Sequence, residues 1–102
     1  MLDLGALLAR IEGFQWDDGN TDKNVLGHDV TQAEAEEIFF HAPVVLLEDA
    51  KHSVSEQRFL IYGPTNAGRL LSAAFTIRAN RLRVISIRDM SRQERRRYAK
   101  AP

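Results

Sequence analysis

The stretch LLSAAFTIRANRLRVISI, residues 70–87, decides the fold class of this chain. Two runs rich in β-branched and apolar residues, 70–77 and 82–87, are separated by the polar segment Arg78–Arg81. This pattern favours two antiparallel strands joined by a short turn. Two earlier runs, 44–47 and 58–62, have the same character, so we expect the hairpin to extend into a four-stranded antiparallel meander.

The segment before these strands has helical patterns. Residues 2–11 place four leucines and an isoleucine on one stripe, which predicts a short amphipathic helix ending at Gly13. Its apolar face needs a cover, and we expect it to pack on this domain or in a homodimer. Phe14–Trp16 is typical of a brief strand, and one of the two aspartates that follow is expected to cap a second helix reaching about Leu26.

Two capping boxes predict the remaining helices. Thr31 with Glu34 opens one, which Pro43 ends, and Ser91 with Glu94 opens another. The buried side of the first is expected to consist of Ala33, Ala35, Ile38 and Phe39. The predicted fold class is therefore α+β, with N-terminal helices, a four-stranded antiparallel sheet packed on one face, and a C-terminal helix.

Charge divides almost cleanly at the midpoint of the chain. Residues 1–50 carry 2 basic residues against 11 acidic ones, a net of −9, and residues 51–102 carry 12 against 3, a net of +9. The segment from Arg78 to Arg97 contains many arginines but only two acidic residues, Asp89 and Glu94. The basic half could hold a polyanion, and the alternative is that the two halves neutralise each other within the fold.

Composition excludes several classes of protein. A chain of 102 residues is expected to form one small domain, and the absence of cysteine excludes disulfides and thiolate metal sites. The first twelve residues do not have the pattern of a secretory signal, and no apolar run approaches the roughly 18 residues of a membrane span. We therefore expect a cytoplasmic protein that is not attached to a membrane.

Several short motifs occur in a specific order. They are Phe14-x-Trp16-Asp17, Asn24, His28-x-Val30, Glu36 and Phe39, followed by His52-x3-Glu56-x-Arg58, Thr76-x-Arg78, Arg83-Val84-Ile85-Ser86-x-Arg88, and Ser91-Arg92-x-Glu94-Arg95 with Tyr98. Together they resemble the BrnT family of bacterial type II toxins. The resemblance covers roughly residues 14–98, which divides the chain into an N-terminal amphipathic extension, 1–12, and a BrnT-like toxin domain, 13–102.

The resemblance implies a RelE-like ribonuclease fold and cleavage of RNA without a metal ion or other cofactor. It also implies inhibition by a BrnA-like antitoxin, and contact with operator DNA only through that antitoxin. Three residues depart from the family pattern: Asn20 and Gly27, where many members have lysine, and Asp29, where many have glycine. They favour an alternative, in which the same fold serves as a non-catalytic RNA-binding or protein-interaction module.

Metal-free cleavage needs groups that move protons. His28 is a candidate because carbonyls at a helix end favour its protonated form, although it could merely cap that helix. Glu56 is a candidate base or an orienting partner of Arg58, and the alternative is a salt bridge that ties down its loop. Asp49 and His52 could join Glu56 as metal ligands, but no second histidine has a ligand-like spacing, so we predict no metal site.

Arginines are the expected partners of the phosphate. Arg58, Arg78 and Arg88 are predicted to stabilise the transition state, since a guanidinium stays charged and can bind phosphate bidentately. Arg88 also precedes the helix that begins after Ser91, whose first amides could help to hold an anion. In a regular strand Arg83 and Arg88 point to opposite faces, so a phosphate site that uses both requires a bulge, a strand end or two sites.

Further residues are predicted to bind RNA without taking part in the chemistry. They are Lys23, Arg83, Arg92, Arg96 and Tyr98. The alternative for the arginines after Ser91 is a solvated helix face, and for Tyr98 it is a cover for the core. The other large aromatic residues, Trp16, Phe39, Phe59 and Phe75, are expected in the core.

Overall fold

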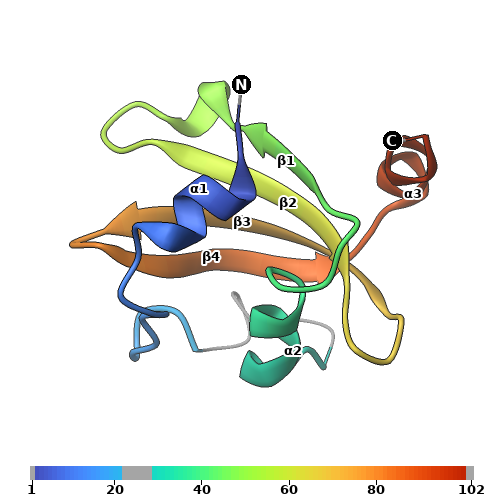
Figure 1. The fold of residues 1–102 in the computed structure, drawn as a ribbon, viewed down its shortest axis with the longest axis horizontal. Helices are drawn as coiled ribbons and strands as arrows, with labels where there is room; N and C mark the ends of the chain where they lie inside the picture. Colours follow the sequence, from blue (N-terminus) through green and yellow to red (C-terminus); the bar gives the residue numbers. More distant parts are fainter. Residues whose placement is uncertain (1, 22–28, 101–102) are drawn as a thin grey trace.

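The chain folds around a four-stranded antiparallel sheet in the order β1-β2-β3-β4 (Figure 1). A computed structural model of the chain describes residues 2–21 and 29–100. The strands are β1 (Val45–Glu48), β2 (Arg58–Pro64), β3 (Leu70–Arg78) and β4 (Arg81–Asp89), and the helices are α1 (Leu4–Ala9), α2 (Gln32–Glu37), the 3₁₀ turn η1 (Ala50–His52) and α3 (Arg92–Ala99). The predicted α+β class, the meander and the C-terminal helix are confirmed.

The β3–β4 hairpin closes with a two-residue turn. Arg78 pairs with Arg81, and the two residues between them, Ala79 and Asn80, have φ angles of 50° and 63°. Positive φ at both central positions is typical of a type I′ turn, whose twist matches that of the flanking strands. Asparagine adopts this conformation readily, which favours the observed register.

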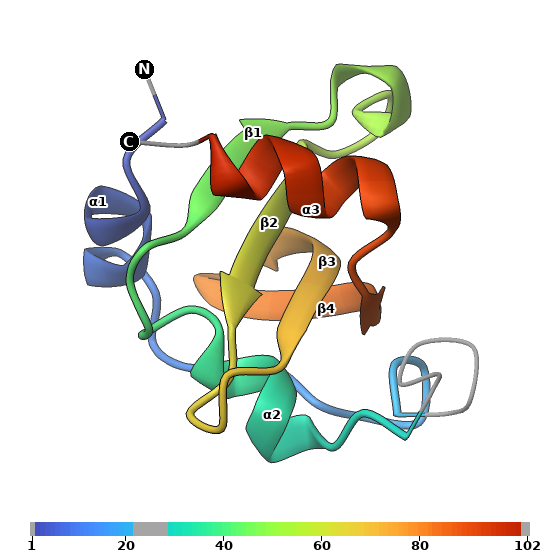
Figure 2. The same ribbon diagram turned by 90° about the vertical axis from the view of Figure 1, so that its right-hand side faces the viewer.

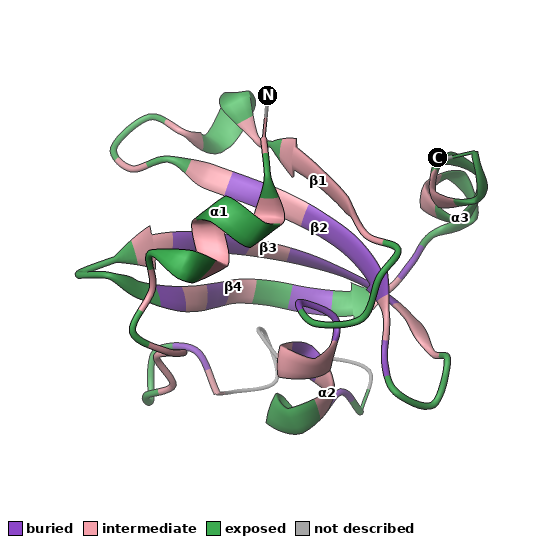
Figure 3. Cartoon of the chain, viewed as in Figure 1, coloured by how far each residue is buried: buried purple, intermediate pink, exposed green. Residues whose placement is uncertain are grey.

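One face of the sheet carries the core. Phe75 of β3 stacks on Phe59 of β2 with ring centroids 5.2 Å apart, and Phe39, just after α2, meets Phe75 edge-on at 5.0 Å. The apolar residues of α1, including Leu4 and Leu8, pack against this cluster, so the expectation that the stripe packs on this domain is confirmed. Figure 3 shows the buried residues concentrated on the strands and around α2.

The segment before α2 differs from the prediction. The expected strand at Phe14–Trp16 is reduced to one parallel bridge between Phe14 and Leu82, because β4 is an edge strand whose free backbone groups bond to this segment. The Leu82 amide donates to the Gly13 carbonyl, and the Leu82 carbonyl accepts from the Gln15 amide, each at 2.9 Å.

The predicted second helix is also absent where the structure describes it. Residues 17–21 form a turn, in which Asp17 and Asn20 side chains bond to nearby backbone groups instead of starting a helix. Residues 22–28 lie outside the described residues. Both capping boxes are present as predicted. Ala33 is exposed rather than buried, because the side of this segment that faces the core consists of Ala35, Ile38 and Phe39.

Helix α3 packs on β2 and crosses the sheet in the view of Figure 2. The Tyr98 hydroxyl donates to the Pro43 carbonyl at 2.6 Å, which fixes the end of α3 to the segment before β1. Burial raises the pKa of Tyr98 above its usual value. Within the described residues, no helix has the length and apolar character that crossing a membrane requires.

Candidate functional site

A β-bulge in β4 decides where its arginines point. Ala74 of β3 pairs with Ser86, whereas the next residue, Phe75, pairs with Val84, so Ile85 is an extra residue in β4. Leu82, Val84 and Ile87 therefore all face the core. Arg83 and Arg88 consequently share the opposite face of the sheet. A single phosphate site that uses both arginines is therefore geometrically possible, because the strand contains a bulge between them.

Other arginines lie on that same side of the sheet. Arg58 pairs with Thr76, Thr76 pairs with Arg83, and Arg78 pairs with Arg81 across the ladder. Directly paired residues of antiparallel strands have their side chains on one face. We call this surface the arginine face, and it consists of Arg58, Arg78, Arg81, Arg83 and Arg88.

Three carboxylates reach the arginine face from three different segments, and each binds one guanidinium through two hydrogen bonds. The carboxylates come from the turn after Trp16, from the loop before β2, and from the first turn of α3. Such two-point pairs hold the guanidinium in one orientation. The pairs are Asp17–Arg83 (2.8 and 3.1 Å), Glu56–Arg78 (2.7 and 3.2 Å) and Glu94–Arg88 (2.7 and 3.0 Å).

These pairs keep the carboxylates ionised. The hydrogen bond from Arg78 lowers the pKa of Glu56 below its ordinary value, and that from Arg83 lowers the pKa of Asp17, helped by the Gly19 amide. Glu56 is therefore a carboxylate at neutral pH. In that state it can accept a proton but has none to donate.

The turn that carries Asp17 is closely fitted to Arg83. A Cβ atom at Gly19 would lie 2.7 Å from Nη2 of Arg83, so a side chain there would displace the guanidinium. Asn20 is almost fully buried: its Oδ1 accepts from the Asp17 amide at 2.8 Å, and its Nδ2 donates to the carbonyls of Gln15 and Val84. Asn20 thus fastens the turn to β4 and places Asp17 over Arg83.

Glu94 occupies the N-terminus of α3. Burial raises the pKa of Glu94, but hydrogen bonds from Arg88 and the Ser91 amide outweigh it and hold the pKa below its ordinary value. The anion beside Arg88 and the first amides of α3 is therefore this carboxylate of the chain itself. An adjoining hollow of about 410 Å³ is lined by residues that include Tyr62 and Arg97.

Arg58 differs from the three paired arginines. Its Nε is buried and has no hydrogen-bond partner, and no carboxylate of the described residues forms an ion pair with it. Its backbone is well fixed, because its amide donates to Ser53 Oγ at 2.9 Å and its carbonyl accepts from the Asp49 amide. Arg58 is therefore a cation of the arginine face whose backbone is fixed and whose guanidinium has no carboxylate partner among the described residues.

The remaining predicted residues lie elsewhere. His28 and Lys23 are outside the described residues. Arg92 and Arg96 are exposed on α3, and Tyr98 bonds to the backbone as described above. His52 Nδ1 lies 2.8 Å from Asp49 Oδ2, and the part of the chain that the structure describes holds no cluster of His, Asp and Glu suited to a metal ion.

The part of the chain that carries the arginine face matches a model of a known protein family. The family model for "Ribonuclease toxin, BrnT, of type II toxin-antitoxin system" matches residues 16–94. The chain belongs to the BrnT family. The match spans the whole arginine face of this BrnT chain and leaves α1 outside. A search of curated proteins found no significant match.

Sequence reasoning missed the roles of Asp17 and Asn20 in this BrnT chain. The sequence pattern favours one of the two aspartates as a helix cap, and it marks Asn20 only as a position where many family members have a lysine. The composition of the segment, two aspartates followed by glycine and asparagine, is typical of a tight turn and was the signal available. The partner, Arg83, lies 66 residues away and has no local signal.

Proposed function

We propose that this BrnT chain is an endoribonuclease that cleaves RNA at the arginine face without a metal ion. The observation that carries the proposal is that five arginines lie on one side of the sheet. The bulge at Ile85 brings Arg88 to the same side as Arg83. A phosphoryl-transfer site needs fixed cations where charge develops on the phosphorane oxygens. Arg58, Arg78 and Arg88 are the proposed donors.

The proposed reaction is an internal transfer within RNA. Glu56 accepts the proton of a ribose 2′-hydroxyl, the 2′ oxygen attacks the adjacent phosphorus, and the bond to the 5′ oxygen breaks. The leaving oxygen takes a proton, for which His28 is the candidate donor. The products are a 2′,3′-cyclic phosphate and a 5′-hydroxyl. The low pKa of Glu56 supports the role of base over that of acid.

The ion pairs of the carboxylates on the arginine face support metal independence. Asp17, Glu56 and Glu94 each bind a different guanidinium, so they are not arranged to share a cation. The positive charge that a metal ion would supply is already present as arginine. Exposed Arg92 and Arg96 on α3 are proposed to extend the RNA-binding surface.

Membership of a type II toxin family implies an antitoxin as partner and RNA as substrate. We propose a BrnA-like antitoxin whose acidic side chains cover the arginine face and which alone contacts operator DNA. Such a complex should associate quickly, and its association should slow as salt rises, because charge steers the encounter.

Cleavage in the presence of a chelator tests the proposal. We expect the purified protein to cut RNA in excess EDTA and to leave 2′,3′-cyclic or 3′-phosphate ends, which electrophoresis and mass spectrometry detect. An oligonucleotide with a deoxyribose at the cut site should stay intact, since it lacks the attacking hydroxyl. RNA that binds but remains uncut under every condition would favour the non-catalytic module.

The pH dependence of cleavage tests the role of Glu56. Arg78 holds the pKa of Glu56 below its ordinary value of about 4.3, so loss of this base should appear only on the acidic side of that value. Arg78→Met removes the partner and should move this acidic limb of the kcat/KM profile to higher pH.

Arg81→Met is the matched control for this experiment. It removes the same charge from the same hairpin, but the structure gives Arg81 no carboxylate partner among the described residues. The limb should stay in place in this variant. If Arg78→Met also left the limb unmoved, another group would be the base.

A further inference from the structure

A pocket lies on the other side of the sheet from the arginine face, at the same end of the strands. It has a volume of about 160 Å³ and is lined by Leu7, Arg10, Gln57, Phe59, Ile77 and Asn80. Gln57 is adjacent in sequence to Arg58, Ile77 is adjacent to Arg78, and Asn80 belongs to the hairpin turn. Because alternate strand residues face opposite sides, the pocket and the arginine face are built from neighbouring residues of β2 and β3.

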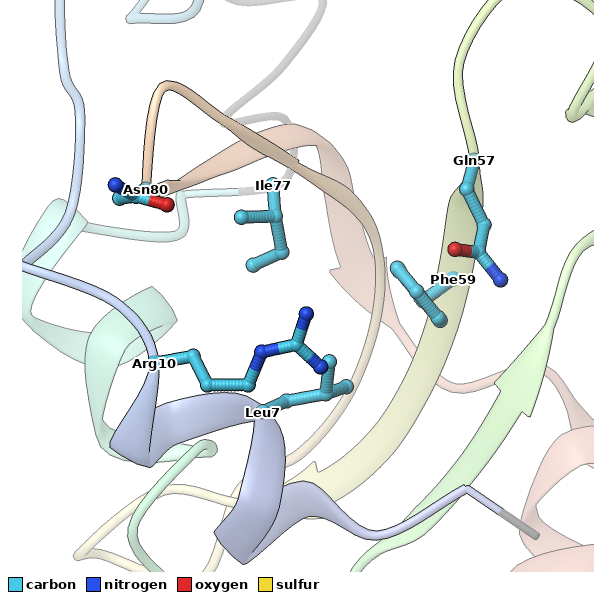
Figure 4. A pocket seen from close by; sticks show the side chains of 6 residues that line it. All are labelled: Leu7, Arg10, Gln57, Phe59, Ile77 and Asn80. Carbon is cyan, nitrogen blue, oxygen red and sulfur yellow. The ribbon is translucent and has the colours of Figure 1, made fainter.

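The polar groups of the pocket lie around its apolar side chains. Figure 4 shows the Arg10 guanidinium extending from the end of α1 into the space between Ile77 and Phe59, with the amides of Gln57 and Asn80 on either side. No carboxylate among the described residues forms an ion pair with Arg10. The guanidinium therefore keeps its donors available over an apolar surface.

The size and chemistry of the pocket fit part of a planar aromatic base. An apolar cavity of about 150 Å³ is known to hold a benzene molecule, so this space of about 160 Å³ admits an aromatic ring, such as one ring of a fused purine, but not a whole nucleotide. A guanidinium can donate two parallel hydrogen bonds to O6 and N7 of guanine, and amide oxygens can accept from the N–H groups of the same base. Leucine, isoleucine and phenylalanine offer an apolar contact for the ring.

We propose that this pocket binds an RNA base, preferentially guanine, that flanks the cleaved phosphate. The inference rests on the proposed function and adds a determinant of sequence preference to it. RNA lying on Arg58 and Arg78 reaches the pocket by passing the tip of the β3–β4 hairpin. Arg10 is the C-cap residue of α1 and lies outside the residues matched by the family, so the preference belongs to this chain and not to the family as a whole.

Nuclear magnetic resonance of the full chain tests the pocket without relying on cleavage. Ribonucleoside 5′-monophosphates of the four bases are titrated separately, with ribose 5-phosphate as the control that lacks a base. We expect the guanine nucleotide to shift the side-chain amide signals of Gln57 and Asn80 most. Absence of any such shift, or equal shifts with ribose 5-phosphate, would overturn the proposal.

Variants connect the pocket to sequence preference. Arg10→Met keeps the apolar stem and removes the guanidinium, and it should abolish the nucleotide shifts at Gln57 and Asn80. It should also reduce the preference for guanine beside the cut by about tenfold or more, measured on a panel of short RNAs. Lys51→Met, which removes an exposed cation from η1, should leave shifts and preference unchanged.

The two proposals fail separately in these experiments. Selective shifts by the guanine nucleotide without cleavage of any RNA would remove the ribonuclease proposal and keep the pocket. Cleavage without base-dependent shifts would do the reverse. If Arg10→Met weakened antitoxin binding while nucleotides produced no shift, the pocket would be a protein contact and the proposal would be wrong.

Discussion

Replacing Arg58 with alanine is expected to lower the single-turnover rate of RNA cleavage by about 10²–10³-fold. Arg58 has no carboxylate partner among the described residues, so a phosphate can bind its guanidinium without first displacing a carboxylate. Affinity for RNA should fall only modestly. Arg58→Lys keeps the charge but not the planar fork, and it should give an intermediate rate.

Arg96→Ala is the matched control, because it removes an exposed arginine of α3 that faces no carboxylate partner in the described structure. Its cleavage rate at saturation should change little. Loss of one phosphate contact should lower the slope of log affinity against log salt by about 0.7 for single-stranded RNA. Equal effects of both variants on rate and on slope would contradict this division of roles.

Replacing Asn20 with alanine is expected to lower the free energy of unfolding by about 2–3 kcal/mol. The buried amide makes three hydrogen bonds, to the Asp17 amide and to the carbonyls of Gln15 and Val84, and its loss leaves these backbone groups without partners. Domains of this kind have a total stability of about 5–15 kcal/mol, so the effect is a large share of the whole. Urea denaturation followed by circular dichroism measures it.

Asp18→Ala provides the comparison within the same turn. Asp18 is exposed, and the structure gives its side chain no hydrogen bond among the described residues, so its replacement should change stability by less than about 0.5 kcal/mol. If both variants had equal stability, the turn would not depend on the buried amide. A loss confined to Asn20→Ala would confirm that this residue is structural.

Features that depend on neighbouring residues could be predicted from the sequence. The strands follow from runs of apolar residues, the α2 and α3 caps follow from Thr31 with Glu34 and Ser91 with Glu94, and the packing of α1 follows from its apolar stripe. The meander order follows because short connections favour adjacent antiparallel strands.

Features that depend on distant partners could not be predicted. The segment 13–21 was expected to contain a strand and a helix, but the free edge of β4 and the side chain of Asn20 determine its course instead. The sequence predicts that a phosphate site using both Arg83 and Arg88 needs a bulge, a strand end or two sites, but no residue of Val84-Ile85-Ser86 indicates which of these occurs or where. Glu56 is expected from the sequence to orient Arg58, but among the described residues it binds Arg78 of β3 instead.

The paired state of the arginine face has a consequence for a protein surrounded by nucleic acid. Five guanidinium groups on this face are accompanied by three carboxylates, so the face carries a net charge of +2 rather than +5. Unselective binding to DNA and to bulk RNA depends on the number of phosphates neutralised, and the number that this face can neutralise without losing one of the pairs is small. An incoming phosphate must therefore replace a carboxylate of the chain on its arginine. Discrimination among nucleic acids consequently takes place at close contact, where this exchange occurs.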